Sequence, residues 1–469
     1  MKKIIYLLLI CTLIMGLKYA SQGQGNSSTI KSGITWLDDK GLTVSAHGAC
    51  IIQERNRYYL FGEKHFDNSN AFAGVNCYSS ADLCHWKNEG TALAVQDSGR
   101  LSKDRAGERP KVMKCPKTEE YVMYLHTDNL TYKDQCVGYA TAKTITGPYE
   151  FKGPILFNGN PIKKWDMGTF QDVDGRGYIL IHGGEIYELS DDYHSVVSQV
   201  NKNMTAGFES PALFRKGSTY YFLGSHLTSW ERNDNYYYTA TSLRGPWTAR
   251  GIIAPEGTLT WNSQTTFVLP IIGKTDTTYM YMGDRWSFPL QASAATYVWQ
   301  PLKVSSTSLS LPTYHEEWKL DVNTGIYSVK KAVAKTLTFL DKKTITYEGN
   351  WNIKTIDTLT MMATDTKEAV CKIKFRGRQV SLYSILTPDG GYAKVTLFNE
   401  SGKILTTTIV DMYCKYATSS LIFCSPILKR GKYTLDIMVM GEHSNWSDKR
   451  KANYGSVGNT VSVEKIWIR

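Results

Sequence analysis

A pair of strand-like patterns recurs five times between residues 40 and 302. The first pattern of each pair is an aromatic run, and these runs begin at Tyr58, Tyr121, Tyr178, Tyr220 and Tyr279. A second strand-like pattern follows each run, and these begin at Cys77, Gly138, Ile186, Tyr237 and Thr296. A strand unit that repeats at intervals of roughly 40–60 residues is typical of propeller blades. The repeat therefore predicts a five-bladed β-propeller over residues 34–310.

The rest of the chain also carries β-sheet patterns. Runs that alternate apolar and polar residues between turns occupy Cys371–Ile385, Gly391–Asn399 and Gly431–Gly441. They predict a β-sandwich over residues 346–469, joined to the propeller by a connector at residues 311–345. The predicted fold class is all-β. The sandwich either binds glycan, through Trp351 or Tyr392, or supports the propeller structurally. The sequence shows no row of exposed aromatic residues, which favours the supporting role.

The N-terminus has the pattern of an export signal. Residues 1–20 begin with two lysines and continue as a short apolar run before small and polar residues, which predicts a cleavable signal peptide. Residues 21–33 are rich in Gly and Ser and predict a linker. No later stretch reaches 18 consecutive apolar residues, so no membrane insertion of the mature chain is expected. The predicted location is secreted or periplasmic.

The composition limits cofactors and partners. The chain has 54 Lys and Arg against 43 Asp and Glu, a formal charge of +11 that falls by three if Lys2, Lys3 and Lys18 leave with the signal. The residual basic excess suits an acidic polysaccharide, but no block of Lys or Arg indicates nucleic acid. No spacing resembles a zinc site, and we expect neither a metal nor a cofactor.

Eight cysteines remain once Cys11 is removed with the signal. An even number in an oxidising compartment is compatible with disulfides, and Cys414 and Cys424 are spaced to bridge a hairpin. Buried free thiols are the other interpretation, because most of these cysteines have apolar neighbours. The sequence leaves both open.

Five polar residues occupy equivalent places in the repeat. The innermost strand of each blade lines the central channel of a propeller, so the residue that opens it faces a shared cavity. Reading back from each aromatic run gives His47, Glu108, Asp166, Glu209 and Gln264. Converging carboxyl groups suit acid/base cleavage of a glycosidic bond. A lone carboxylate would more often bond backbone at a strand end, but five polar residues in register favour a site.

The motifs around these residues carry a family resemblance. They are AHG, GERPKV, WDMGTFQDVDG, FESPALF, WNSQTTFVLP and GDRW followed by TYVWQPL. In this order they resemble glycoside hydrolase family 43, and within it the exo-β-1,3-galactanases. The resemblance implies an inverting enzyme that releases galactose from the β-1,3-galactan backbone of type II arabinogalactan. It also implies that Glu209 is the general acid.

The resemblance implies further roles for the other residues of the set. Glu108 matches a carboxylate that contacts the terminal galactose and influences the ionisation of the site, and Asp166 matches another acid that contacts substrate. Most of the family carries an Asp general base where this chain has Ala46-His47-Gly48, and Gln264 matches a glutamine proposed to replace it. A neutral amide does not deprotonate water directly. Our hypothesis is that Gln264 positions the water and Glu108 assists.

Several other polar and aromatic residues near the motifs are predicted to contact sugar. They are Glu63, Glu185, Thr228, Trp230, Asn233, Asp284, Arg285 and Trp286. Aromatic rings pack on the C–H-rich face of a sugar, although packing within a blade explains each ring equally well.

Two other functions fit the sequence. A family 43 arabinofuranosidase or xylosidase would share the fold, because a fold does not determine the sugar. A non-catalytic carbohydrate-binding propeller would explain the missing Asp base, although binding alone does not require the acid Glu209.

Overall fold

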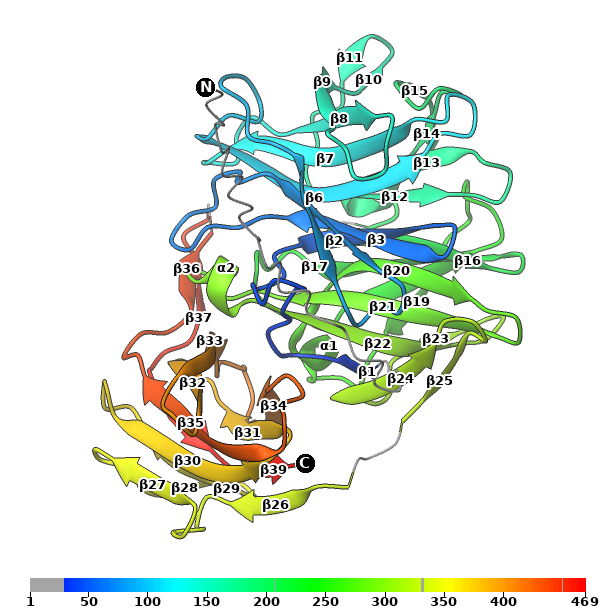
Figure 1. Cartoon of the computed structure of the whole chain (residues 1–469). Coiled ribbons are helices and arrows are strands. Elements are labelled where there is room, and N and C mark those ends of the chain that lie inside the picture. Colours follow the sequence, from blue (N-terminus) through cyan, green and yellow to red (C-terminus); the bar gives the residue numbers. More distant parts are fainter. Residues whose placement is uncertain (1–28, 206, 330–332, 449) are drawn as a thin grey trace, which may run out of the picture.

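The computed structural model describes residues 29–469 except 206, 330–332 and 449. The predicted signal peptide and residues 21–28 of the predicted linker lie outside the described residues. Within the described residues, strands dominate, and the fold is all-β (Figure 1). No helix among these residues is long and apolar enough to cross a membrane.

Residues 47–310 form five sheets, one after another along the chain (Figure 1), in which the strands are antiparallel except where β10 and β15 pair in parallel. The first two comprise β2 (His47–Glu54), β3 (Arg57–Glu63), β4 (Val75–Ser80) and β5 (Lys87–Leu93), then β6 (Arg105–Lys114), β7 (Tyr121–Asn129), β8 (Cys136–Ala142) and β9 (Glu150–Pro154). The third comprises β12 (Met167–Gln171), β13 (Gly177–Ile181), β14 (Glu185–Leu189) and β15 (Val196–Asn201), extended by β10 (Leu156–Phe157) and β11 (Asn160–Pro161). The last two comprise β16 (Phe208–Lys216), β17 (Thr219–His226), β18 (Tyr236–Ala240) and β19 (Thr248–Ile252), then β20 (Gln264–Ile272), β21 (Thr277–Arg285), β22 (Thr296–Val304) and β23 (Leu309–Ser310).

The strands expected from the repeat are present. The five aromatic runs lie in β3, β7, β13, β17 and β21, and the patterns that follow them lie in β4, β8, β14, β18 and β22. Burial is almost continuous along strands such as β7, β13 and β17 because both faces of each sheet are covered by neighbouring sheets. The aromatic repeat therefore located the second and third strands of every sheet.

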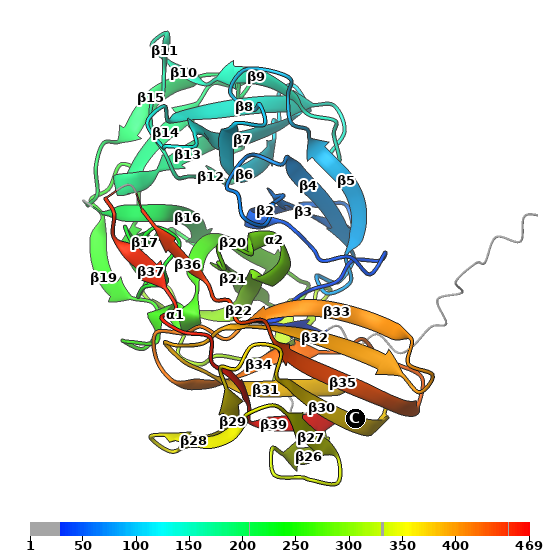
Figure 2. The ribbon, with the colours of Figure 1, turned by 90° about the vertical axis from the view of Figure 1, so that its left-hand side faces the viewer.

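The five sheets surround a common centre (Figure 2). Each first strand packs on the next, in the order β2, β6, β12, β16, β20 and back to β2. An apolar cluster fills the space between each neighbouring pair of sheets. The cluster that joins the last sheet to the first includes Leu60 and Met280, both fully buried. The first strands are thereby held side by side at the centre of the molecule.

Short elements connect and flank these sheets. β1 (Thr29–Lys31) pairs with β24 (Glu317–Asp321), which pairs with β25 (Ile326–Ser328). Three short helices lie in loops: a 3-10 helix at His182–Gly184, α1 (Leu259–Asn262) and α2 (Gln291–Ala294). The predicted linker and connector thus contribute strands that pack against the sheets around the centre.

The remaining residues form a second unit with its own core, below the five sheets in Figure 1. One sheet orders β26 (Lys335–Thr338), β39 (Lys465–Ile468), β31 (Val380–Leu386) and β34 (Thr418–Cys424). The other orders β27 (Ile345–Glu348), β30 (Val370–Gly377), β35 (Gly431–Val439), β32 (Tyr392–Asn399) and β33 (Ile404–Asp411). Smaller sheets comprise β28 (Asn352–Ile356), β29 (Leu359–Thr364) and β38 (Val461–Val463), and the pair β36 (Asn445–Ser447) and β37 (Asn453–Gly455). Strand β26 lies within the predicted connector but pairs with the last strand of the chain.

The cysteines are free thiols. Cys50, Cys77, Cys84, Cys115, Cys136, Cys371, Cys414 and Cys424 form no disulfide. Of the two interpretations that the sequence left open, free thiols is the one that the structure shows, and Cys414 and Cys424 do not share a hairpin. Cys414 follows β33, Cys424 ends β34, and these strands belong to different sheets.

The two units are joined through buried polar groups. The Glu231 carboxylate is 1% exposed and accepts hydrogen bonds from the Tyr413 hydroxyl at 2.7 Å and the Gly455 amide at 3.3 Å. Ser287 donates to Asp411 at 2.8 Å and accepts from the Tyr392 hydroxyl through its backbone oxygen at 2.9 Å. Because buried polar groups must be paired, these bonds specify one orientation of the second unit.

Candidate active site

A cavity of about 980 Å³ opens where the first strands meet. Four of the five polar residues expected to open the first strands line it, namely Glu108, Asp166, Glu209 and Gln264. Glu63, Trp230 and Trp286 line it as well, as does Trp165. The structure therefore brings most of the predicted acids and aromatic side chains together in one place.

A backbone irregularity directs these side chains to the centre. A register shift follows His47 in β2, Glu108 in β6 and Glu209 in β16. The next residue in each strand has a positive φ: Gly48 at 60°, Arg109 at 54° and Ser210 at 56°. A β-bulge of this kind bends the strand and re-aims a side chain, and such strained backbone is common at functional sites.

The Arg109 guanidinium is the centre of the charge network. Its Nε lies 2.9 Å from Asp166 Oδ1, and its Nη2 donates to Ser210 Oγ at 2.7 Å and to Gln264 Oε1 at 2.8 Å. The Arg109 backbone amide donates to Glu63 Oε1 at 2.8 Å. The arginine follows Glu108 directly in the motif ERPKV, so its position beside a predicted acid was the one signal that could have identified it.

Gln264 has all its hydrogen-bonding positions occupied. Its Oε1 accepts from Arg109 and, at 2.9 Å, from Trp286 Nε1. Its Nε2 donates to Glu209 Oε1 at 3.2 Å and to Ser225 Oγ at 3.0 Å. A primary amide offers two donors and two acceptor lone pairs. The orientation of Gln264 is therefore determined, and it holds one oxygen of Glu209 in place.

The environment of Glu209 favours a protonated carboxyl group. Burial raises its pKa well above the ordinary value, and the nearby charge of Asp166 adds to that effect. The Arg109 cation acts in the opposite direction but does not outweigh them. Since Gln264 donates to Oε1, the other oxygen of Glu209 is the natural position for the proton. A neutral carboxyl group that points into a cavity is suited to general acid catalysis.

Glu108 lies in a different electrostatic environment. Its carboxylate accepts from the Tyr132 hydroxyl at 2.6 Å and lies 3.1 Å from His126 Nδ1, while His126 Nε2 lies 3.2 Å from Asp128. Burial alone would lower the pKa of His126, but its bonds to Asp128 and Glu108 raise the pKa to about 9. Burial alone would raise the pKa of Glu108, but the hydrogen bond and charge of His126 lower it. The environment of Glu108 therefore favours the carboxylate, whereas that of Glu209, which lines the same cavity, favours the protonated acid.

Two predicted residues lie beneath the cavity. His47 is 2% exposed and stacks on Tyr297 with ring centroids 4.3 Å apart. Burial lowers its pKa well below the ordinary value, so it is neutral. Asp284 accepts from the Gly48 amide at 3.1 Å, and burial raises its pKa to about 7. Both support the floor of the site and neither lines the cavity.

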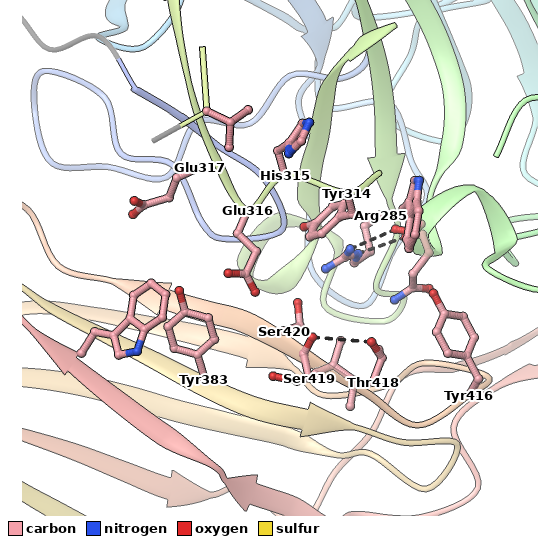
Figure 3. Close-up of a pocket in the computed structure, with 15 residues that line it drawn as sticks. Arg285, Tyr314, His315, Glu316, Glu317, Tyr383, Tyr416, Thr418, Ser419 and Ser420 are labelled. Atoms are coloured by element: carbon pink, nitrogen blue, oxygen red, sulfur yellow. Dashed lines mark hydrogen bonds between the residues drawn. The ribbon is translucent and has the colours of Figure 1, made fainter. Parts of the chain in front are cut away.

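Four other predicted residues do not line the cavity. Thr228 is nevertheless next to it: its backbone hydrogen-bonds the Glu209 carboxyl group, which acts to lower the pKa of that group, and its side chain accepts a hydrogen bond from Asn233 at 2.6 Å. Glu185 pairs with Lys164 at 2.7 Å. Arg285 donates to the backbone of Asn262 at 3.0 Å and lines a second cavity of about 380 Å³ between the two units (Figure 3). Proximity to a motif in sequence was the only basis for these four residues, and it placed only Thr228 in contact with a cavity residue by its backbone.

The second unit supplies part of the cavity wall. The β36–β37 pair and its turn contribute Trp446, Asp448, Arg450, Asn453 and Tyr454. The sequence contained no signal for this, because these residues lie far from the repeat along the chain. Among the described residues, no group of three or more His, Cys, Asp or Glu side chains is arranged to hold a metal ion.

Comparisons with known proteins agree with this geometry. The family model for glycosyl hydrolases family 43 matches residues 42–253. A solved structure described as a candidate exo-β-1,3-galactanase from Bifidobacterium bifidum is 38% identical, with a TM-score of 0.57, over 61% of this chain and 96% of that chain. The chain belongs to glycosyl hydrolase family 43. It is therefore a glycoside hydrolase.

Other family 43 structures match more of the chain. The exo-β-1,3-galactanase from Phanerochaete chrysosporium, solved with galactose, is 29% identical with a TM-score of 0.72 over 94% of this chain and 100% of that chain. A variant of that protein was solved with β-1,3-galactotriose. The exo-β-1,3-galactanase from Clostridium thermocellum is 26% identical with a TM-score of 0.60 over 73% of this chain and 86% of that chain. No curated protein matches the sequence.

The raised pKa of His126 gives the site a testable pH dependence. Below about pH 6.5, the ordinary pKa of histidine, the stabilisation from the His126 ion pairs is fully present, and it is lost as the pH rises through about 9. The difference in unfolding free energy between the wild type and His126→Gln should therefore shrink over this interval, measured by urea unfolding. His443→Gln, at a half-buried histidine outside the cavity, is the control. Parallel profiles for wild type and His126→Gln would contradict the ion pairs.

Proposed function

We propose that this chain is an inverting exo-β-1,3-galactanase that releases galactose from the end of a β-1,3-galactan, the backbone of type II arabinogalactan. The observation that carries the proposal is that two carboxyl groups with oppositely shifted pKa values, raised for Glu209 and lowered for Glu108, line one cavity. Environments that separate the pKa values of two carboxyl groups are typical of glycosidases. The substrates of similar family 43 structures support galactan as the polymer.

We further propose that the five sheets are the blades of a five-bladed β-propeller over residues 34–310, and that residues 346–469 form a β-sandwich. The cyclic packing of the first strands and the five apolar clusters between sheets support the first assignment. Two large sheets on either side of one core support the second. The predicted signal peptide supports secretion or release to the periplasm.

In the proposed mechanism Glu209 protonates the oxygen of the glycosidic bond. The bond to the leaving chain breaks, a water attacks the anomeric carbon from the opposite face, and the water loses a proton to a base. Inversion follows, so a β-linked galactose leaves as the α-anomer. Gln264 fixes one oxygen of Glu209 and thereby directs its proton into the cavity.

We assign the positioning of the attacking water to Gln264 and Glu108 together. Gln264 must release one of its four partners before it holds a water, whereas Glu108 has lone pairs beyond those used by Tyr132 and His126. Its lowered pKa makes Glu108 a weak base, so we assign it to assist by accepting a hydrogen bond from the water. Asp166, Glu63, Trp230 and Trp286 are assigned to the terminal galactose because they line the same cavity.

Replacement of the acid tests the mechanism. Glu209→Gln keeps the shape of the side chain but has no acidic proton, so kcat on β-1,3-galactotriose should fall about 10²- to 10⁴-fold. In the wild type, nuclear magnetic resonance of the anomeric protons should detect α-galactose first. Early β-galactose would contradict inversion. Release of arabinose or xylose from other glycans in place of galactose would favour the other family 43 specificities. Binding without hydrolysis would favour the non-catalytic propeller.

Glu108 is tested by the same substitution. Glu108→Gln removes the negative charge that faces His126, and kcat should fall about 10²-fold if the carboxylate assists the water. Glu185→Gln is the matched control, because Glu185 lies outside the cavity. Galactose release at the wild-type rate by Glu108→Gln would remove Glu108 from this role.

A further inference from the structure

The β36–β37 pair of the second unit lies at the mouth of the cavity. Trp446 of β36 pairs directly with Tyr454 of β37, and both line the cavity. Figure 2 shows the pair, in red, extending from the second unit across the ends of β16 and β17. The active-site cavity is therefore bounded by both units.

An aromatic row runs along this side of the cavity and crosses from one unit to the other. Trp230 stacks on Phe288 with centroids 5.1 Å apart, and it lies 6.3 Å from Trp446. Trp446 in turn stacks on Tyr454 at 5.9 Å. All four rings line the cavity. Aromatic faces arranged in a row suit successive sugar rings of a polymer.

Polar groups accompany the row on the second unit. Arg450 pairs with Asp448, with Nη2 2.7 Å from Oδ2, and the Tyr454 hydroxyl donates to the same oxygen at 3.2 Å. The Asn453 side chain is exposed at the cavity edge. Charged and amide groups beside an aromatic face are the chemistry that binds sugar hydroxyls.

The hairpin is fixed relative to the catalytic acid. The Gly455 amide donates to the buried Glu231, and the Asn445 amide donates to the Phe288 oxygen at 3.0 Å. Arg450 Nη2 donates to the Leu227 oxygen at 3.2 Å. The charge of Arg450 reaches Glu209, since it acts to lower the pKa of that carboxyl group. A rigid rim at this position adds binding without a large entropic cost on association.

We propose that the β36–β37 hairpin forms a sugar subsite for the part of the galactan chain on the leaving-group side of the cleaved bond. The inference rests on the proposed function. In an exo-acting enzyme the terminal sugar binds at the deep end of the cavity, where the acids lie, so the remaining sugar units of the chain extend through the cavity mouth. There the half-buried Tyr454 supplies a face for stacking, supported from behind by the buried Trp446, while Asp448, Arg450 and Asn453 meet hydroxyl groups. The second unit therefore takes part in substrate selection as well as in support.

Binding measured in the full-length Glu209→Gln protein separates this subsite from the deep one. Galactose occupies only the terminal position, whereas β-1,3-galactotriose extends to the rim. Tyr454→Ala should weaken the trisaccharide about five- to tenfold, the typical effect of losing a stacking face, and should change the Kd of galactose less than about twofold. Isothermal titration calorimetry measures both. Tyr454→Phe keeps the ring and should bind the trisaccharide nearly as the parent does.

Two substitutions that remove the same charge test the polar residues of the β36–β37 hairpin. Arg450→Ala and Lys451→Ala each remove one positive charge from the same turn, but only Arg450 lines the cavity. Arg450→Ala should weaken trisaccharide binding and Lys451→Ala should not. Unchanged trisaccharide affinity in both Tyr454→Ala and Arg450→Ala would overturn the proposal, as would an equal loss for galactose. A wild-type chain that releases no galactose from the trisaccharide would instead contradict the proposed function.

Discussion

The site depends on the buried guanidinium of Arg109 among several acids. Arg109 bonds Asp166, and the charges of Asp284, Glu63 and Glu209 also act on it. A second buried cation, Lys111, acts on Asp284 and Glu63, and burial lowers its pKa to about 8. Two cations do not neutralise four carboxylates, and uncompensated buried charge is costly. The pKa values of the acids differ as a result. Burial raises the pKa of Glu209 and of Asp284, whereas the hydrogen bond and charge of His126 lower the pKa of Glu108. The site therefore combines a carboxyl group suited to donate a proton with one suited to accept a hydrogen bond.

The fold can place several acids close together because they come from different sheets. Glu108, Asp166, Glu209 and Gln264 lie in or directly before four different first strands, and a bulge directly follows Glu108 and Glu209. The apolar clusters between sheets hold the five strands against the repulsion of their own acids. The second unit, anchored through Glu231 and Ser287, completes the wall on one side. Stability and function are therefore supplied by different parts of the same strands.

The sequence predicted those features that repeat. The aromatic runs located the second and third strands, and counting back from them found Glu108, Asp166, Glu209 and Gln264. The repeat contained no information on partners that occur once, such as Arg109 or His126, although each is close to a predicted residue along the chain. Contacts between distant segments were invisible, which is why Trp446 and Tyr454 were missed. A short spacing was also uninformative, since Cys414 and Cys424 are close in sequence but belong to the ends of strands in different sheets, after β33 and in β34.

The proposed function requires Glu209 to be a neutral acid at pH values where ordinary carboxyl groups are ionised. The most direct measurement is the infrared difference spectrum between the wild type and Glu209→Gln, followed as a function of pH. A carboxylic acid C=O band that persists at neutral pH and disappears only well above the ordinary glutamate pKa of about 4.3 is the result that this account predicts. A band that is lost at or below that value would contradict it, because the proton donor assigned here would then be absent under working conditions.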